Sequence, residues 1–127
     1  MTPRPSCKGD ENALKALWRE VFGDTDEYID AFFQNVYQPG MASVIEEDGT
    51  VVAAAYAVPF GAVRYIFAVA TRPEYRGRGY GRAVVYHCAG WLQEKNLIPL
   101  VACETHRESF YAGLGFQKIS EVTVFTG

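Results

Sequence analysis

The chain has few cysteines, and their spacing fits neither a metal site nor a disulfide framework. Cys7, Cys88 and Cys103 are the only three, and an odd number is more typical of a reducing compartment. The two histidines, His87 and His106, do not make a metal site either. Cys103-x-x-His106 could join a nucleophile to its base, but a small apolar strand residue is the simpler interpretation of Cys103. We expect a cytoplasmic protein without a metal.

The sequence also lacks an apolar run of transmembrane length, and its opening, MTPRPSCKGDEN, has no hydrophobic signal core. Positive charge is not in excess, since 12 Lys and Arg against 15 Asp and Glu give a net charge of −3. A nucleic-acid-binding domain would be basic, so we expect neither a nucleic acid nor a membrane as partner. Hydrophobic residues make up 49% and aromatic residues 14%, which is typical of one packed domain over residues 1–127.

The most informative stretch is residues 65 to 91, YIFAVATRPEYRGRGYGRAVVYHCAGW. Residues 65 to 70 are almost continuously apolar, which predicts a strand buried on both faces and hence central in its sheet. Pro73 ends this strand, and three glycines follow within five positions. Apolar residues then recur at helical spacing and predict an amphipathic helix that packs on the sheet. They are Tyr80, Val84, Cys88, Trp91 and Leu92.

The order of strand, glycine turn and helix predicts an anion site at the turn. The first turn of a helix has unpaired N–H groups at the positive end of the helix dipole, and glycines let an anion reach them. Arginines flank the turn and can hold phosphate oxygens in pairs. They are Arg72, Arg76, Arg78 and Arg82. We therefore expect a phosphate or pyrophosphate ligand.

Two common phosphate motifs are absent from this turn. No GxxxxGK(S/T) sequence is present, which excludes a P-loop. Gly77-x-Gly79-x-Gly81 differs from the dinucleotide motif GxGxxG, because its third glycine comes one residue early and Arg82 takes that place. A solvated positive turn, or an arginine–glycine segment that binds nucleic acid, remains the alternative.

Two helices are predicted before the first clear strand. Asp10 can cap the first helix, and Gly23 ends it. Asp24-x-x-Glu27 resembles a capping box for the second helix, which stops at Pro39.

Strands follow these helices, and a further helix comes near the end. Asp48-Gly49 predicts a β-hairpin turn. The strand after the motif helix should run parallel to the strand before it, because a strand–helix–strand unit crosses over. Thr105-x-x-Glu108 resembles a capping box for a last helix over residues 107 to 114. The expected strands are residues 42 to 47, 50 to 58, 62 to 70, 100 to 103 and 116 to 125.

The glycine turn resembles motif A of the GNAT family of N-acetyltransferases, R/Q-x-x-G-x-G/A, in the form Arg76-x-x-Gly79-x-Gly81. The four residues PEYR that lead into it are also similar to the family's pattern. Residues 108 to 116, ESFYAGLGF, resemble the family's late FYxxLGF helix. Two motifs at the expected separation are more specific than either alone.

The resemblance covers nearly the whole chain and implies the GNAT fold, of α/β (α+β) class, with a mixed, mostly antiparallel central sheet flanked by helices. The segments ALKALWREVFGDTDEYIDAFF and YIFAVATRPEYRGRG look most like the Eis-like bacterial branch. The chain has one strand after LGF where the family has two, and residues 1 to 9 show no clear strand. An edge strand would then be missing, and we expect a second copy of the chain to pair with the open edge as a homodimer.

The resemblance implies acetyl-CoA as co-substrate. The backbone of Ala68, Val69 and Ala70 would pair with the pantetheine arm like an added strand, and one of their N–H groups would face the thioester oxygen as an oxyanion hole. The pyrophosphate would lie on the glycine turn. The turn residues implied are Arg76, Gly77, Arg78, Gly79, Tyr80, Gly81 and Arg82.

The resemblance also implies catalytic residues. Tyr111 occupies the place of the family's tyrosine near the coenzyme sulfur, and a phenol with an ordinary pKa of about 10 can protonate the departing thiolate; the alternative is an aromatic that only packs. The base is less evident, because residues 62 to 70 contain no acid. Glu104 is the nearest candidate, although it could act structurally and a water chain could replace it.

The acceptor would be a primary amine. Asp24, Asp26 and Glu27 lie where the family's first helices border the acceptor site and would favour a cationic amine, unless they are ordinary acids of a helix start. The function implied is transfer of the acetyl group of acetyl-CoA directly to a primary amine of a small molecule or protein. The alternative is a catalytically weak acyl-CoA-binding sensor or assembly module, because no base is evident and the C-terminus is short.

Overall fold

The computed structural model describes residues 2–102 and 105–119. Its strands are β1 Arg4–Pro5, β2 Ala42–Glu47, β3 Thr50–Phe60, β4 Val63–Thr71 and β5 Ile98–Val101. Its α-helices are α1 Glu11–Phe22, α2 Asp26–Asn35, α3 Tyr80–Glu94 and α4 Glu108–Ala112. Single 3-10 turns lie at Lys8–Asp10, Pro73–Tyr75 and Thr105–Arg107.

The strands form one sheet in the order β1-β2-β3-β4-β5. Every neighbouring pair is antiparallel except β4 and β5, which are parallel on either side of the α3 crossover. The predicted mixed, mostly antiparallel sheet is therefore confirmed. The proline-rich start contributes the two-residue strand β1, which pairs with β2.

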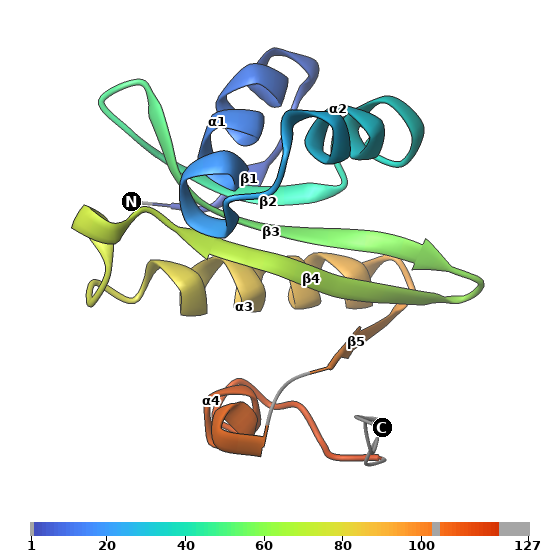
Figure 1. The fold of residues 1–127 in the computed structure, drawn as a ribbon. Helices are drawn as coiled ribbons and strands as arrows, with labels where there is room; N and C mark the ends of the chain where they lie inside the picture. The colour runs from blue at the N-terminus through green and yellow to red at the C-terminus, as the bar shows by residue number, and fades with distance from the viewer. Residues whose placement is uncertain (1, 103–104, 120–127) are drawn as a thin grey trace, which may run out of the picture.

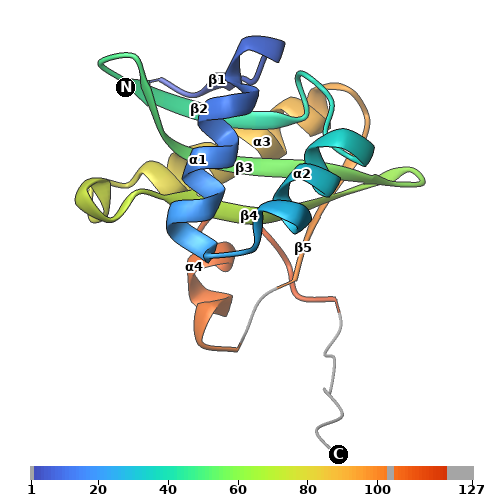
Figure 2. The same ribbon diagram turned by 45° about the horizontal axis from the view of Figure 1, so that its top comes forward.

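Helices cover both faces of this sheet (Figure 1). The first two helices, α1 and α2, lie on one face, and α3 lies on the other. Figure 2 shows α1 crossing the strands and turning into α2. One core cluster accordingly joins Leu14, Leu17, Trp18, Ile29, Phe32 and Phe33 to the sheet. The other joins Val84, Val85, Cys88 and Leu92 to its opposite face.

The caps of the first helices differ from the sequence prediction. Gly23 ends α1 in the left-handed conformation, as expected (φ 68°). Asp10 does not cap α1 with its side chain; its carboxylate accepts hydrogen bonds from the Arg4 guanidinium and the Cys7 N–H. The cap of α2 is Thr25, whose hydroxyl accepts from the Tyr28 N–H at 3.2 Å. The predicted capping box was therefore one residue too early.

The central, fully buried strand is β3 and not, as predicted, β4. Residues 51 to 57 of β3 are all buried, whereas only Ile66 and Ala70 are buried in β4. The side chains of β3 are mostly alanine and valine, and such small residues let helices approach a strand from both faces. β4 is instead interrupted by a bulge opposite β3 and, among the described residues, pairs with β5 only from Val63 to Ile66.

The C-terminal part of the described chain is less regular than predicted. The last helix, α4, is shorter than residues 107 to 114, and Gly115 follows it with a φ of 99°. Residues 116 to 119 form no strand, and the rest of the predicted final strand lies outside the described residues. Within the described ranges, no helix combines the length and hydrophobicity that a membrane crossing requires.

Candidate active site

The glycine turn lies between β4 and α3, as predicted. After the 3-10 turn Pro73–Tyr75, Gly77 and Gly79 have φ angles of 81° and 80°. Non-glycine residues rarely adopt this conformation, so the turn depends on glycine at both positions. Gly79 is also the N-cap of α3. The last residues of the motif, Tyr80 and Gly81, therefore belong to the first turn of the 15-residue helix α3, where backbone N–H groups have no partner within the helix.

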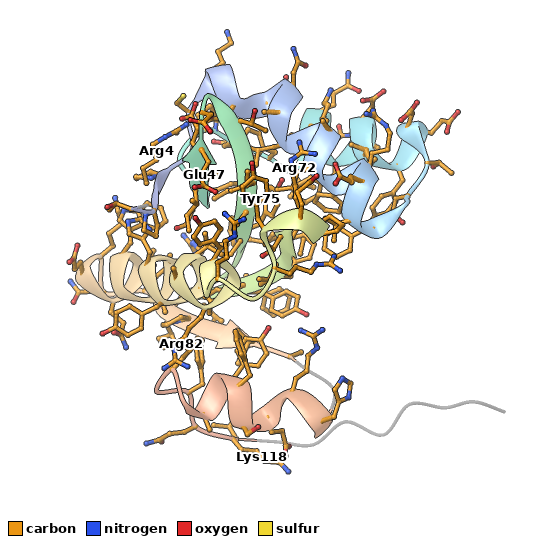
Figure 3. The ribbon with its side chains drawn as sticks, turned by 90° about the vertical axis from the view of Figure 1, so that its left-hand side faces the viewer. Arg4, Glu47, Arg72, Tyr75, Arg82 and Lys118 are labelled. Atoms are coloured by element: carbon orange, nitrogen blue, oxygen red, sulfur yellow. The ribbon has the colours of Figure 1, made fainter. Side chains whose placement is uncertain are left out.

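Three of the four predicted arginines surround this turn with exposed side chains. Arg76 donates from Nε to the Thr71 carbonyl at 3.2 Å. Arg78 lies over the Tyr75 ring at 4.9 Å. Arg82 reaches from α3 toward α4 and donates to the Gly113 carbonyl at 3.3 Å (Figure 3). Each keeps further N–H donors for an anion.

Arg72 does not belong to this group. It donates to the Val51 carbonyl at 3.0 Å and to the Glu20 carboxylate on α1, and its side chain is only 15% exposed. Arg72 therefore fastens the end of β4 to α1, which corrects the prediction that it faces the phosphate. The sequence could not separate it from the other arginines, because its position one residue before Pro73 does not reveal the direction of its side chain.

A hollow of about 310 Å³ opens at the turn. It is lined by Thr71, Tyr75, Arg76, Gly77, Gly79, Tyr80, Gly81, Arg82 and Phe110. Six of the predicted coenzyme residues thus line a single hollow. Arg78 does not line it and lies 3.6 Å from the Glu47 carboxylate. Phe110 of α4 was not predicted as a lining residue, although it stands next to Tyr111 in the FYxxLGF motif.

Among the residues that the structure describes, the strand that leads into the turn has an open edge. The parallel pairing of β5 with β4 runs from Val63 opposite Ile98 to Ile66 opposite Val101. Beyond Ile66, the last five residues of β4 have no partner on that side among the described residues. Their N–H and C=O groups on this edge are available to an extended ligand, as on any free sheet edge.

A β-bulge lies within this open half of β4. Ala70 pairs with Ala54 and Phe67 with Tyr56, so two residues of β4 stand opposite Ala55. Ala68 adopts a φ of 53° there, which is strained for a residue with a side chain. The bulged residues are Ala68 and Val69, two of the three residues predicted to meet the pantetheine arm. The bulge changes the direction of their backbone N–H and C=O groups at the open edge.

The bulge separates two surfaces of the protein. Val69 and Thr71 face the start of α3, since a Cβ on Gly81 would lie 3.5 Å from the Thr71 hydroxyl and 4.0 Å from a Val69 methyl. Phe67 and Ala68 pack instead against the core beneath α1 and α2. A ligand that follows the glycine turn therefore reaches β4 from the α3 side.

The two predicted catalytic residues have different outcomes. Tyr111 lies on α4, half-buried, with its ring 5.0 Å from Phe110 and 5.9 Å from Phe116. It also packs against the core beneath α3. Glu104 lies outside the described residues. The roles of both residues remain predictions.

The acids near the start of α2 are largely engaged within the protein. Asp24 accepts a 2.7 Å hydrogen bond from Trp18 Nε1, and Asp26 pairs with Arg19 Nε at 2.8 Å. Glu27 is exposed and makes no hydrogen bond or ion pair within the described residues. Two of the three predicted acceptor-site acids thus have structural roles as well.

The two cysteines that the structure describes, Cys7 and Cys88, lie apart from the glycine turn and are both free thiols. Burial raises the pKa of the Cys88 thiol to about 11, so it stays protonated at neutral pH. Cys7 is an exposed free thiol, and Cys103 lies outside the described residues. Among the residues that the structure describes, no group of three His, Cys, Asp or Glu side chains could hold a metal ion.

A mixed sheet with helices on both faces, and a glycine turn at the start of α3, define the class of the N-acetyltransferases. The model of the acetyltransferase (GNAT) family matches residues 11–116. The chain therefore belongs to the acetyltransferase (GNAT) family.

Several solved structures share this fold. The aminoglycoside N-acetyltransferase AAC(6')-Iy, in complex with the bisubstrate analog CoA-S-monomethyl-acetylneamine, has a TM-score of 0.78 and 16% identity over 98% of this chain and 96% of that chain. A putative acetyltransferase from Agrobacterium tumefaciens str. C58 has a TM-score of 0.72 and 26% identity over 100% of both chains. Glucosamine-6-phosphate N-acetyltransferase from Arabidopsis thaliana has a TM-score of 0.72 and 21% identity over 99% and 98%. A search of curated proteins found no match.

Proposed function

We propose that this acetyltransferase, acting as a single domain, moves the acetyl group of acetyl-CoA directly to a primary amine of a small molecule or protein. The observation that supports this most is the continuity of the bulged, open half of β4 with the glycine turn of α3. A coenzyme with an extended arm and a pyrophosphate has both features in the same order. The CoA complex of the similar aminoglycoside N-acetyltransferase supports the choice of coenzyme.

In this proposal the backbone of Ala68, Val69 and Ala70 pairs with the pantetheine arm. The pyrophosphate lies in the hollow at the turn, where helix N–H groups, the helix dipole and guanidinium groups all favour an anion. The residues proposed for it are Arg76, Gly77, Arg78, Gly79, Tyr80, Gly81 and Arg82. Arg82 can serve the phosphate while still donating to α4, because a guanidinium has five N–H donors.

The chemistry would be a direct attack of the neutral amine on the thioester carbonyl carbon. Negative charge develops on the carbonyl oxygen, and an N–H group at the Ala68–Val69 bulge would stabilise it. The C–S bond then breaks, and Tyr111 would give its phenolic proton to the sulfur. Glu104 or a water would take the proton that the amine loses.

The second candidate is a GNAT-like domain that binds acyl-CoA but turns it over weakly, as a sensor or assembly module. Its support is the absence of any acid from β4, where no side chain could act as a general base. The two candidates share the coenzyme site and differ only in catalysis.

Finer assignments rest on the sequence. We propose the Eis-like bacterial branch from the two segments that resemble it, and the cytoplasm from the odd number of cysteines. The acidic net charge supports an amine-bearing acceptor as partner, without nucleic acid or a membrane.

The test is release of free thiol from acetyl-CoA in the presence of primary amines, with mass spectrometry of the amine. The proposal expects amine-dependent thiol release and a product heavier by one acetyl group. Coenzyme binding without any acetylated amine would favour the weakly catalytic module. An acetyl group found on a side chain of the enzyme itself, and passed from there to the amine, would contradict direct transfer.

A further inference from the structure

We propose that the acceptor site is an aromatic surface at the junction of α1 and α2, and that it selects a primary amine carried on an apolar or aromatic body. This inference rests on the proposed function and names its substrate class. The surface consists of Phe22, Tyr28 and Phe67, grouped around the edge of Trp18. It disfavours both polycationic aminoglycosides and sugar phosphates.

The aromatic rings form one connected group. The Trp18 ring centroid lies 5.7 Å from Phe22, 6.2 Å from Tyr28 and 6.0 Å from Phe67. Trp18 itself is buried, whereas Phe22 is 42% exposed and Tyr28 is 54% exposed. Rings held in place by a buried tryptophan offer a preformed apolar surface to a ligand.

This surface adjoins the proposed site of transfer. Phe67 directly precedes the bulge at Ala68, and both residues pack beneath α1 and α2. The glycine turn and the hollow lie on the other side of the bulge, next to α3. Because the coenzyme would occupy that side, the amine must approach the thioester from the side of α1 and α2.

The cations of α1 and of the residue that follows β4 are paired with carboxylates. Three cations here are each bound to a carboxylate: Arg72 to Glu20, Arg19 to Asp26 and Lys15 to Asp30. A sugar phosphate would find none of these three cations unpaired. A polycationic aminoglycoside would have to compete with them for the acids.

The carboxylates not paired with a cation are few. Asp24 is held by the neutral Trp18 indole, and Glu27 is exposed beside Tyr28 in the sequence. The Asp24 carboxylate at the edge of the Trp18 ring suits a single ammonium group, which aromatic faces also attract through cation–π interaction. The remainder of such an acceptor would then rest on the exposed rings. One amine on an apolar body fits this combination best.

The test compares three acceptors with acetyl-CoA: 2-phenylethylamine, neamine and glucosamine 6-phosphate. Free-thiol release should give 2-phenylethylamine the highest kcat/KM, at least tenfold above the other two. A higher kcat/KM for neamine or for the sugar phosphate would overturn the inference while leaving the proposed function intact. Turnover of none of the three would also overturn it, and a melting shift with acetyl-CoA would then show whether the coenzyme site had failed as well.

Variants locate the effect at the proposed surface. Phe22→Ala and Tyr28→Ala should each lower the ratio of kcat/KM for 2-phenylethylamine to that for ethylamine by about tenfold, since only the larger amine reaches the rings. Partial unfolding of a variant does not change this ratio, because it lowers the concentration of active enzyme equally for both amines. The matched control is Phe60→Ala, which removes a 78% exposed ring at the distant β3–β4 hairpin and should leave the ratio unchanged. Equal ratios in all four proteins would overturn the inference.

Discussion

Tyr111 tests the proposed chemistry through a single hydroxyl group. Tyr111→Phe keeps the ring and its contacts with Phe110 and Phe116, so the fold should change little. If the phenol protonates the departing thiolate, kcat and kcat/KM should fall together by roughly 10²- to 10⁴-fold. Steady-state kinetics with the best amine provide the measurement.

The control for this variant is Tyr86→Phe, which removes a hydroxyl from an exposed tyrosine of α3. It should retain the wild-type rate, and both variants should keep the melting shift with acetyl-CoA. Wild-type turnover of Tyr111→Phe would show that Tyr111 only packs. Loss of its melting shift would assign the hydroxyl to coenzyme binding.

Asp10 provides a prediction about acid stability. Its carboxylate accepts two hydrogen bonds from Arg4, at 2.8 and 2.9 Å, and these lower its pKa from 3.8 to about 2. A carboxyl group whose pKa is lower in the folded state stabilises the fold above its unfolded pKa, and this stabilisation is lost as the pH falls from about 4 to about 2.

The variant that isolates this group is Asp10→Asn, which keeps the shape of the side chain and removes the titration. Urea unfolding between pH 5 and pH 2 should show a smaller loss of stability for the variant than for the wild type. Its stability at pH 7 should be lower. If the free energy of unfolding fell equally steeply with pH below pH 4 in the variant and in the wild type, the role of the Arg4–Asp10 pair would be contradicted.

At the scale of elements, α3 carries glycines of two kinds. Gly90 lies inside the helix, where an added Cβ would meet nothing within 4 Å. Alanine is a better helix former than glycine by about 1 kcal/mol. Gly90→Ala should therefore raise the melting temperature by a few degrees, as measured by thermal unfolding, without changing acetyl-CoA affinity.

Gly79→Ala is the matched contrast at the start of the same helix. An added Cβ would be equally free of contacts there, but the φ of 80° disfavours any side chain. The variant should lose about 1 kcal/mol of stability and bind acetyl-CoA more weakly. A stability gain for Gly90→Ala and a stability loss for Gly79→Ala would distinguish the effect of helix propensity from that of backbone strain. A stabilised Gly79→Ala protein would contradict this account of the turn.

The sequence predicted the elements well where a local signal exists. Apolar residues that recur every 3.6 positions predicted α1, α2 and α3. Asp48-Gly49 predicted the hairpin turn, and these two residues have φ angles of 51° and 79°. The prediction of β4 as the central strand was wrong, because an apolar run does not reveal how many strands lie on each side. The two-residue strand β1 is specified only by its pairing with β2, which no local pattern encodes.

The candidate site was predicted less completely than the fold. The glycine turn follows from glycine and arginine chemistry, and the structure gathers six of its predicted residues around one hollow. The direction of Arg72 depends on Glu20, which is far away in sequence. The bulge at Ala68 depends on a register shift against β3. Such long-range pairings cannot be inferred from one sequence without the fold.

At the scale of the whole molecule, we expect self-association. The edge predicted to be open is that of the last strand, residues 116 to 125, most of which lies outside the described residues. An open sheet edge is a common site of pairing between copies. Light scattering at high micromolar concentration should give the mass of a dimer. A monomer mass throughout this range would contradict the prediction.

The central claim is that acetyl-CoA binds at the glycine turn, and thermal unfolding with and without it tests this most directly. At about 100 times Kd, the ligand should add about 2.7 kcal/mol to stability, a shift of several degrees. Arg76→Glu and Gly79→Glu should lose most of this shift, whereas Lys8→Glu, a charge reversal near β1 at the other edge of the sheet, should retain it. No shift in well-folded wild-type protein with millimolar acetyl-CoA, or the same shift in all variants, would contradict the claim.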